Sequence, residues 1–227
     1  MTEPEPEPDD PGEQEEQRLA SRSLAAGDPI GWFEDLYAAG VGGRIQVPWS
    51  RTEPHPMLTQ WTSEQQLDGL DRNAIVVGCA LGADAEHIVG LGFDTVAFDV
   101  SPTAIRLARQ RHPDSSVRYV TADLLDPPPD WLQAFDLVIE VITVQALPDP
   151  PRRQAIVNVG RLVAPGGTLL VIAWRDDDRA PPPPPWPLHR GEIDAFAIDG
   201  LTTQHVEQVA LPGEQYELRW RVQFRRD

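Results

Sequence analysis

The stretch "NAIVVGCALGADAEHIVGLGF", residues 73–93, contains the change of pattern that decides the fold. Its apolar, β-branched beginning predicts a buried strand at residues 73–78. Gly78 and Gly82 then mark a turn, and residues 83–91 continue with helical spacing. A buried strand, a glycine turn and a helix form the opening unit of a parallel α/β sheet, in which a ligand can approach the turn closely.

The same alternation continues along the chain and predicts a sheet that helices cover on both faces. Further strands are expected at 94–99, 117–121, 135–140 and 168–174, with helices at 102–111 and 151–163. Two β-rich runs on either side of Pro212-Gly213 predict a closing hairpin. The expected fold class is therefore α/β, Rossmann-like and mostly parallel, with an antiparallel C-terminal hairpin strand.

The N-terminal part differs in composition from this alternating region. Residues 1–26 are expected to form a disordered acidic tail, because their first half holds many carboxylates and little apolar surface. Residues 27–70 are expected to cap a core at 71–227, the two together making one domain over 27–227. Helical spacing on both sides of Asp28-Pro29 predicts two helical pieces. The five prolines at 181–185 predict a stiff surface connector.

Composition excludes several classes of function. The net charge is −17, so nucleic acid and anionic membrane surfaces are not expected partners. All 19 basic residues are arginines, which excludes Schiff-base chemistry and a phosphate-binding P-loop lysine. The single cysteine, Cys79, excludes an internal disulfide, and no metal-ligand spacing is present. The acidic start is unlike a signal peptide and no apolar run of 18 residues occurs, so the expected location is the cytoplasm. Composition predicts no oligomeric state.

Acidic residues stand at the ends of successive predicted strands, where parallel sheets bind ligands. Asp99 ends the strand at 94–99, 21 positions after Gly78, where a carboxylate binds ribose hydroxyls. Asp123 lies just past the next strand, and Glu140 ends the one after it. Each acid alone could be a helix cap or a surface residue, but together they predict a nucleoside site.

Two nucleoside cofactors compete for this site. A nicotinamide dinucleotide needs a G-x-G-x-x-G turn, but the template gives Gly78, Ala80 and Ala83. Asp84 and Glu86 in the following helical turn would also repel its phosphates. S-adenosylmethionine fits better because it lacks phosphate and carries a sulfonium and an ammonium group.

These residues resemble the class I S-adenosylmethionine-dependent methyltransferases over about residues 70–175. "VVGCALG" corresponds to the glycine-rich first motif, "FDVSPTAIRLARQ" to the ribose-binding acid, and "YVTADLLD" to the adenine-contacting acid. "FDLVIE" and "LVAPGGTLLVIAW" match the fourth and fifth strands. The resemblance implies S-adenosyl-L-methionine as cofactor, and the residues expected to contact it are Gly78, Ala80, Gly82, Asp99, Asp123, Leu124 and Glu140.

The N-terminal third narrows the resemblance. "WFEDLYAAGVGGRIQVPWSRTEPHPML" and "EVITVQALP" are similar to the thiopurine, thiol and halide methyltransferase family. This resemblance implies that Trp32 and Trp49 cover the cofactor. The acceptor would be a small molecule, such as a thiol or another soft nucleophile. No catalytic residue is predicted, and His55 is the one histidine selected for a test as a base.

The chain departs from these families at three places. Val76 replaces a common acid, Ala80 replaces the middle glycine, and "EVITVQ" lacks the aromatic residues of the thiol and halide branch. Two other functions therefore stay open, namely a non-catalytic S-adenosylmethionine-binding regulator and a nicotinamide-dependent oxidoreductase.

Overall fold

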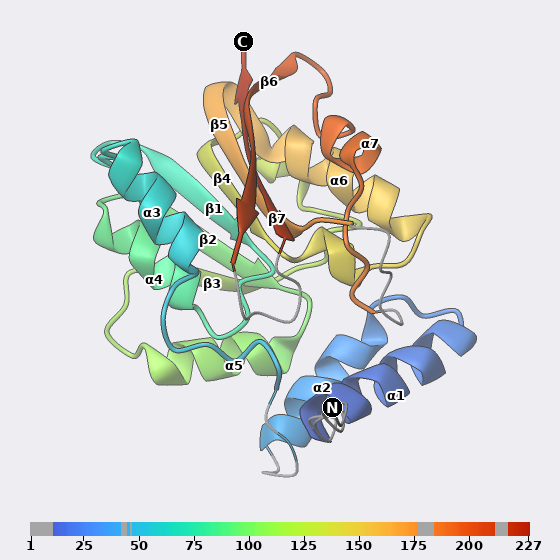
Figure 1. Ribbon diagram of the computed structural model, residues 1–227. Helices are drawn as coiled ribbons and strands as arrows, with labels where there is room; N and C mark the ends of the chain where they lie inside the picture. The colour runs from blue at the N-terminus through green and yellow to red at the C-terminus, as the bar shows by residue number, and fades with distance from the viewer. Residues whose placement is uncertain (1–10, 42–44, 46, 177–183, 212–217) are drawn as a thin grey trace, which may run out of the picture.

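A computed structural model describes residues 11–41, 45, 47–176, 184–211 and 218–227. Its seven-stranded sheet has the order β3-β2-β1-β4-β5-β7-β6, with β1 to β5 parallel and β7 antiparallel to both of its neighbours (Figure 1). This confirms the expected fold class. The strands are β1 (Asn73–Val77), β2 (Asp94–Asp99), β3 (Arg118–Thr121), β4 (Phe135–Val141), β5 (Val163–Trp174), β6 (Leu201–Ala210) and β7 (Leu218–Arg226).

The register of the central strands brings their carboxyl ends together. Val77 at the end of β1 pairs with Phe98 on one side and Glu140 on the other. Strand β7 runs the other way, so its beginning lies at the same edge, where Arg219 pairs with Trp174 of β5. Residues far apart in sequence therefore meet at one edge of the sheet.

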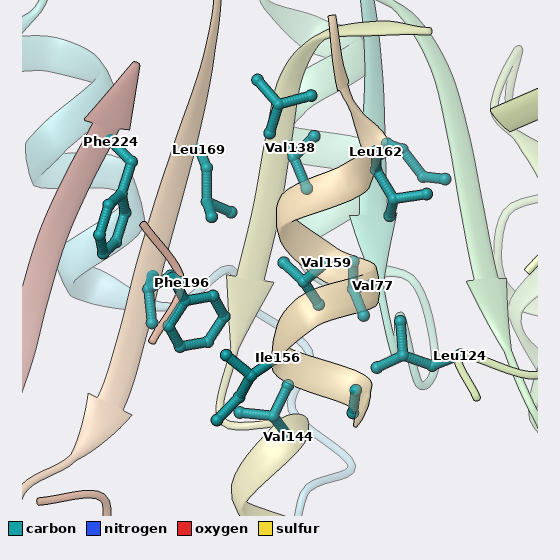
Figure 2. Packing of buried hydrophobic residues seen from close by; sticks show 14 of the residues in the cluster. Val77, Leu124, Val138, Val144, Ile156, Val159, Leu162, Leu169, Phe196 and Phe224 are labelled. Carbon is teal, nitrogen blue, oxygen red and sulfur yellow. The ribbon is translucent and has the colours of Figure 1, made fainter. Parts of the chain in front are cut away.

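Helices cover both faces of the sheet, as the strand–helix alternation predicts (Figure 1). One face packs against α3, α4 and α5 and the other against α6 and α7, each through a cluster of buried apolar side chains. Figure 2 shows Ile156, Val159 and Leu162 of α6 directed at Val138 and Leu169 of the sheet. The helices are α3 (Pro56–Glu64), α4 (Ala83–Gly90), α5 (Pro102–Arg111), α6 (Pro151–Leu162) and α7 (Arg190–Asp194), with 3-10 turns at η1 (Pro129–Trp131) and η2 (Val144–Ala146).

Two N-terminal helices, α1 (Pro11–Ala25) and α2 (Gly31–Val41), lie beyond the carboxyl edge of the sheet (Figure 1). They confirm the two helical pieces, but α1 differs from the disordered tail expected over 1–26. Leu19 and Ala20 are buried in a cluster with side chains of α2, and this tertiary packing offsets the unfavourable local composition. Residues 1–10 lie outside the described part of the chain.

A carboxylate attaches α2 to the body of the domain. Glu34 accepts hydrogen bonds from the hydroxyl of Ser101 and from the backbone N–H and hydroxyl of Thr103, at the beginning of α5. Ser101 follows Asp99 by two residues, so this contact fixes α2 directly beside the end of β2. The helical cap is therefore positioned over the predicted site.

Candidate functional site

A cavity of about 580 Å³ opens at the carboxyl edge of the sheet, within the range of about 300–1,000 Å³ that small-molecule sites occupy. Its walls come from both halves of the sheet and from the N-terminal cap. Six of the predicted site residues line it, namely Trp49, Gly78, Ala80, Asp99, Asp123 and Leu124.

The turn after β1 has backbone angles that explain its glycines. Gly78, Ala80 and Gly82 all have positive φ, at 58°, 49° and 93°. A Cβ atom on Gly78 would lie 2.5 Å from the side chain of Thr143, so this position has no room for a larger residue. Ala80 adopts a left-handed conformation that glycine tolerates better than alanine, so the alanine is strained where the family resemblance expects glycine.

Asp99 is held by the turn that it faces. Its Oδ2 accepts the backbone N–H of Ala80 at 3.0 Å, and its Oδ1 accepts that of Ser101 at 2.9 Å. Burial raises the pKa of Asp99 to about 6, although these N–H groups act in the opposite direction. Each carboxylate oxygen has a second lone pair, so Asp99 can still accept ribose hydroxyls from the cavity.

Asp123 and Leu124 line the cavity just past β3. Oδ1 of Asp123 accepts the backbone N–H of Leu125 at 2.8 Å, which fixes the loop. The carbonyl of Leu124 accepts a hydrogen bond from Asn158 of α6. This loop is therefore attached to α6, and the side chains of Asp123 and Leu124 line the cavity.

Aromatic side chains form the wall that the N-terminal cap contributes. Trp49 lines the cavity together with Phe33 and Tyr37, and its Nε1 donates a 2.7 Å hydrogen bond to the Tyr37 hydroxyl. Trp32 does not line the cavity, because it is 1% exposed and stacks on Phe33 with 3.9 Å between the ring centroids. Of the two tryptophans expected to cover the cofactor, Trp49 lines the cavity beside Phe33, and Trp32 lies behind them.

Gly82 and Glu140 also lie outside the cavity wall. Gly82 is the N-cap of α4, and a Cβ there would lie 2.3 Å from the Tyr119 hydroxyl. Glu140 is fully buried, and its Oε1 accepts the backbone N–H groups of Thr143 and Val144. Both residues therefore support the backbone of segments that line the cavity without lining it themselves. Burial raises the pKa of Glu140 to about 7, against the effect of these two hydrogen bonds.

His55 is a hydrogen-bond donor rather than a base. It lines the cavity at the beginning of α3, and its Nδ1 accepts the backbone N–H of Met57 at 3.2 Å. Burial, and then the charges of Arg51 and Arg219, lower its pKa to about 3, so the ring is neutral. A neutral ring that accepts through Nδ1 carries its proton on Nε2. His55 can therefore donate a hydrogen bond into the cavity but cannot take a proton at that atom.

The other end of the cavity contains residues that the sequence did not single out. Trp174 ends β5 and Arg219 begins β7, and the guanidinium carbon of Arg219 lies 5.5 Å from the centroid of the Trp174 ring system. Arg51 lies between the cap and α4, with its Nη2 3.3 Å from Oδ2 of Asp84. Pro184 and Pro185 of the expected surface connector also line the cavity, while residues 181–183 lie outside the described ranges.

Two features are absent from the residues that the structure describes. None of the helices in these ranges combines the length and the apolar composition needed to cross a bilayer. Within the same ranges, no group of three or more His, Cys, Asp or Glu side chains is arranged to hold a metal ion.

Comparison with known proteins shows which proteins the sheet and its turn resemble. Residues 74–167 match the family model described as "Methyltransferase domain". The chain is 26% identical over 146 residues to a 2-heptyl-1-hydroxyquinolin-4(1H)-one methyltransferase from Mycobacteroides abscessus, covering 63% of each chain. It is 30% identical over 154 residues to nodulation protein S from Sinorhizobium fredii, covering 67% of this chain and 63% of that one. The chain thus spans about three-fifths of the length of these curated relatives.

A solved structure agrees with the sequence matches. The N-methyltransferase NodS from Bradyrhizobium japonicum, in complex with S-adenosyl-L-homocysteine, superimposes with a TM-score of 0.62 at 25% identity, over 79% of this chain and 91% of NodS. The chain therefore has the class I S-adenosylmethionine-dependent methyltransferase fold and contains a methyltransferase domain over residues 74–167. None of these three matches is named as a thiopurine, thiol or halide methyltransferase, so the resemblance to that branch gains no specific support here.

Proposed function

We propose that this protein is an S-adenosylmethionine-dependent methyltransferase that acts on a small-molecule acceptor. The observation that carries the proposal is Asp99, a buried carboxylate at the end of β2 that lines the cavity and accepts the backbone N–H of Ala80 in the left-handed turn. The fold supports the same cofactor, since NodS is described in complex with S-adenosyl-L-homocysteine.

The residues of the cavity fit this cofactor. Asp99 offers lone pairs to the ribose hydroxyls, and Asp123 offers an acceptor to the adenine amine. Trp49 and Phe33 cover this end with apolar surface. A dinucleotide fits less well, because Asp84 lies in the first turn of α4, where a pyrophosphate would need positive potential.

The cofactor supplies an electrophilic methyl group bonded to a sulfonium sulfur. Transfer forms a bond between the acceptor's nucleophilic atom and the methyl carbon, while the electrons of the broken carbon–sulfur bond return to sulfur. The protein positions the two partners in line and excludes water, and positioning supplies much of the acceleration in such displacements. His55 cannot take a proton from the acceptor at its Nε2, because a neutral ring that accepts through Nδ1 already carries its proton there.

The acceptor class is the open part of the function. The relatives are named for a hydroxyquinolinone and for nodulation, and the similarity to the thiol and halide branch suggests a thiol. A panel of aryl thiols, phenols, carboxylates and amines, assayed for S-adenosylhomocysteine formed, covers these classes. Formation with any member distinguishes an enzyme from a non-catalytic cofactor-binding regulator.

The decisive test of the site is calorimetric titration with S-adenosylhomocysteine. Asp99→Ala should weaken binding by about tenfold to a hundredfold, because charge-assisted hydrogen bonds are worth about 1.5–3 kcal/mol each. Asp94→Ala is the matched control, since Asp94 is an exposed acid at the opposite end of the same strand. Equal affinity of the two variants for S-adenosylhomocysteine would contradict the proposal. If the wild type binds NADH more tightly than S-adenosylhomocysteine, an oxidoreductase is favoured.

A further inference from the structure

His55 keeps one hydrogen-bond donor that the protein itself does not use. The residue is 6% exposed and lines the cavity at the N-cap of α3. Its Nδ1 accepts the backbone N–H of Met57, and its pKa is lowered to about 3, mainly by burial, so the ring is neutral with its proton on Nε2. Among the residues that the structure describes, none accepts this proton. Because an unsatisfied buried donor is costly, a ligand in the cavity is expected to supply the acceptor.

The position of His55 indicates which part of a ligand it meets. Its backbone N–H donates to Oδ1 of Asp84 at 2.7 Å, and Asp84 lines the same cavity in the first turn of α4. Helix α4 begins at Ala83, directly after the turn in which Ala80 donates to Asp99. Asp99, the turn, the beginning of α4 and His55 therefore follow one another along the wall of the cavity.

The charges beside His55 favour a group that carries both signs. Nη2 of Arg51 lies 3.3 Å from Oδ2 of Asp84, so each of these side chains already has an opposite charge nearby. A simple anion placed here would face the carboxylate of Asp84, and a simple cation would face Arg51. A zwitterion complements both charges when its cation lies toward Asp84 and its anion lies toward Arg51 and the His55 donor.

We propose that the Nε2–H of His55 donates a hydrogen bond to the α-carboxylate of the cofactor's methionine part, whose α-ammonium group lies toward Asp84. This inference rests on the proposed function and deepens it, because Asp99 and Asp123 account only for the ribose and the adenine. Six single bonds of roughly 1.5 Å each join the ribose ring to this carboxylate, whereas the neighbouring strands β2 and β1 are only about 4.8 Å apart. The methionine part is therefore long enough to pass the turn and reach the beginning of α4. A pyrophosphate has no ammonium group to offset the charge of Asp84, so the same site disfavours a dinucleotide.

The test compares two ligands that differ only in the proposed partner of His55. S-adenosylhomocysteine and its decarboxylated form, which keeps the amine, are titrated into the full-length protein by calorimetry. The wild type should bind S-adenosylhomocysteine about tenfold or more tightly than the decarboxylated form, the gain typical of one hydrogen bond to a charged group.

The variant His55→Asn separates ligand binding from the capping of α3. Asparagine is a favoured N-cap, so its Oδ1 can replace Nδ1 of His55 as the acceptor of the Met57 N–H, but it has no donor at the position of Nε2. His55→Asn should therefore bind S-adenosylhomocysteine about tenfold more weakly than the wild type and bind the decarboxylated form as the wild type does. Thermal melting without ligand should show little change.

His189→Asn is the matched control. His189 is the N-cap of α7, and its Nδ1 accepts the backbone N–H of Glu192 at 3.3 Å, but it does not line this cavity. The control variant makes the same substitution at the same kind of cap, so it should bind both ligands as the wild type does.

The outcomes separate the two proposals. If S-adenosylhomocysteine fails to bind the wild type, the proposed function fails. If it binds but the wild type binds the decarboxylated form equally well, the function stands and recognition of the carboxylate is overturned. The role of His55 is also overturned if His55→Asn keeps the full affinity for S-adenosylhomocysteine, or if it weakens both ligands by the same factor.

Discussion

The backbone N–H of Ala80 donates a 3.0 Å hydrogen bond to Oδ2 of Asp99, and this bond joins the turn after β1 to the end of β2. Ala80 reaches this position with a φ of 49°, where an L-residue is strained. The conformation of residue 80 and the orientation of the Asp99 carboxylate are therefore coupled. Any change in the turn is expected to alter cofactor affinity as well as stability.

The first prediction concerns Ala80→Gly. Glycine relieves the strain and removes a methyl group from the cavity wall, so the variant should bind S-adenosylhomocysteine a few-fold to about tenfold more tightly, or about 1 kcal/mol. Calorimetry measures the affinity, and thermal melting without ligand measures the stability. Binding no tighter than wild type, together with a lower melting temperature, would show that the alanine stabilises the fold.

The second prediction concerns Gly78→Ala. The added Cβ would meet Thr143 at 2.5 Å at a φ of 58°, so the variant should lose about 2 kcal/mol or more of unfolding free energy. Gly166→Ala is the control, because Gly166 has a φ of 75° with nothing within 4 Å of an added Cβ. Gly166→Ala should lose only about 1 kcal/mol of unfolding free energy, which is the cost of placing an L-residue in the left-handed conformation without a steric clash.

A double-mutant cycle isolates the clash. Gly78→Ala combined with Thr143→Ala should recover part of the lost stability, because alanine removes the two Thr143 atoms at 2.5 Å from the new methyl group and leaves only the Cβ at 3.0 Å. Urea unfolding of the two single variants and the double variant gives the coupling energy. Simple additivity of the two effects would contradict the clash.

The alternation of strand-like and helix-like segments after residue 73 was enough to predict the sheet. The apolar strands, the acids at their ends and the closing hairpin all follow from local pattern and were confirmed, although several ends shifted by one residue or more. Only the second half of helix α1 was predicted, as the helical piece before Asp28-Pro29. Its acidic first half belongs to a helix that packs on α2 through Leu19 and Ala20. Local composition carries no information about such a tertiary partner.

Only some of the residues that line the cavity could be predicted, because the others reach it through tertiary packing. Asp99 and Asp123 follow strands directly, so the chain order indicated their positions. Arg219 reaches the cavity because the register of the hairpin places it opposite Trp174. His55 was selected from its place in the loop, but it reaches the cavity because α3 packs across to β7, where Trp61 donates to Gln223. No spacing in the sequence encodes these contacts.

The third prediction concerns the pH dependence of stability. Because the pKa of Glu140 is raised to about 7 in the folded protein, the folded state keeps this proton longer than the unfolded chain does. Its contribution is fully present below about pH 4.5 and is lost as pH rises through about 7, a difference of about 3 kcal/mol. Glu140→Gln does not titrate there, so its stability relative to wild type should increase between pH 5 and pH 8.

Urea unfolding at a series of pH values measures this difference. Asp99 also has a raised pKa, but it is present in both proteins and cancels. Glu53→Gln, which removes an exposed carboxyl, provides the control. A constant difference between Glu140→Gln and wild type across this range would disprove the role of Glu140.

The fourth prediction concerns Tyr37→Phe. Loss of the hydroxyl leaves Nε1 of Trp49 without its 2.7 Å acceptor, so the cap should hold this ring less firmly and bind S-adenosylhomocysteine about threefold to tenfold more weakly. Thr95→Val is the control, since it removes a buried hydroxyl bond near the beginning of β2. Equal affinity of Tyr37→Phe and wild type would contradict a role for this hydrogen bond in binding.

The placement of Trp49 and Trp174 in different parts of one cavity has an optical consequence. Each indole borders a separate binding region, so its emission reports the filling of that region. The chain has seven tryptophans, so the signal of each of these two indoles is the part of the ligand-induced change in emission that is lost in Trp49→Phe or in Trp174→Phe. The order in which the two ligands enter the protein can thus be read by stopped-flow fluorescence without any attached dye.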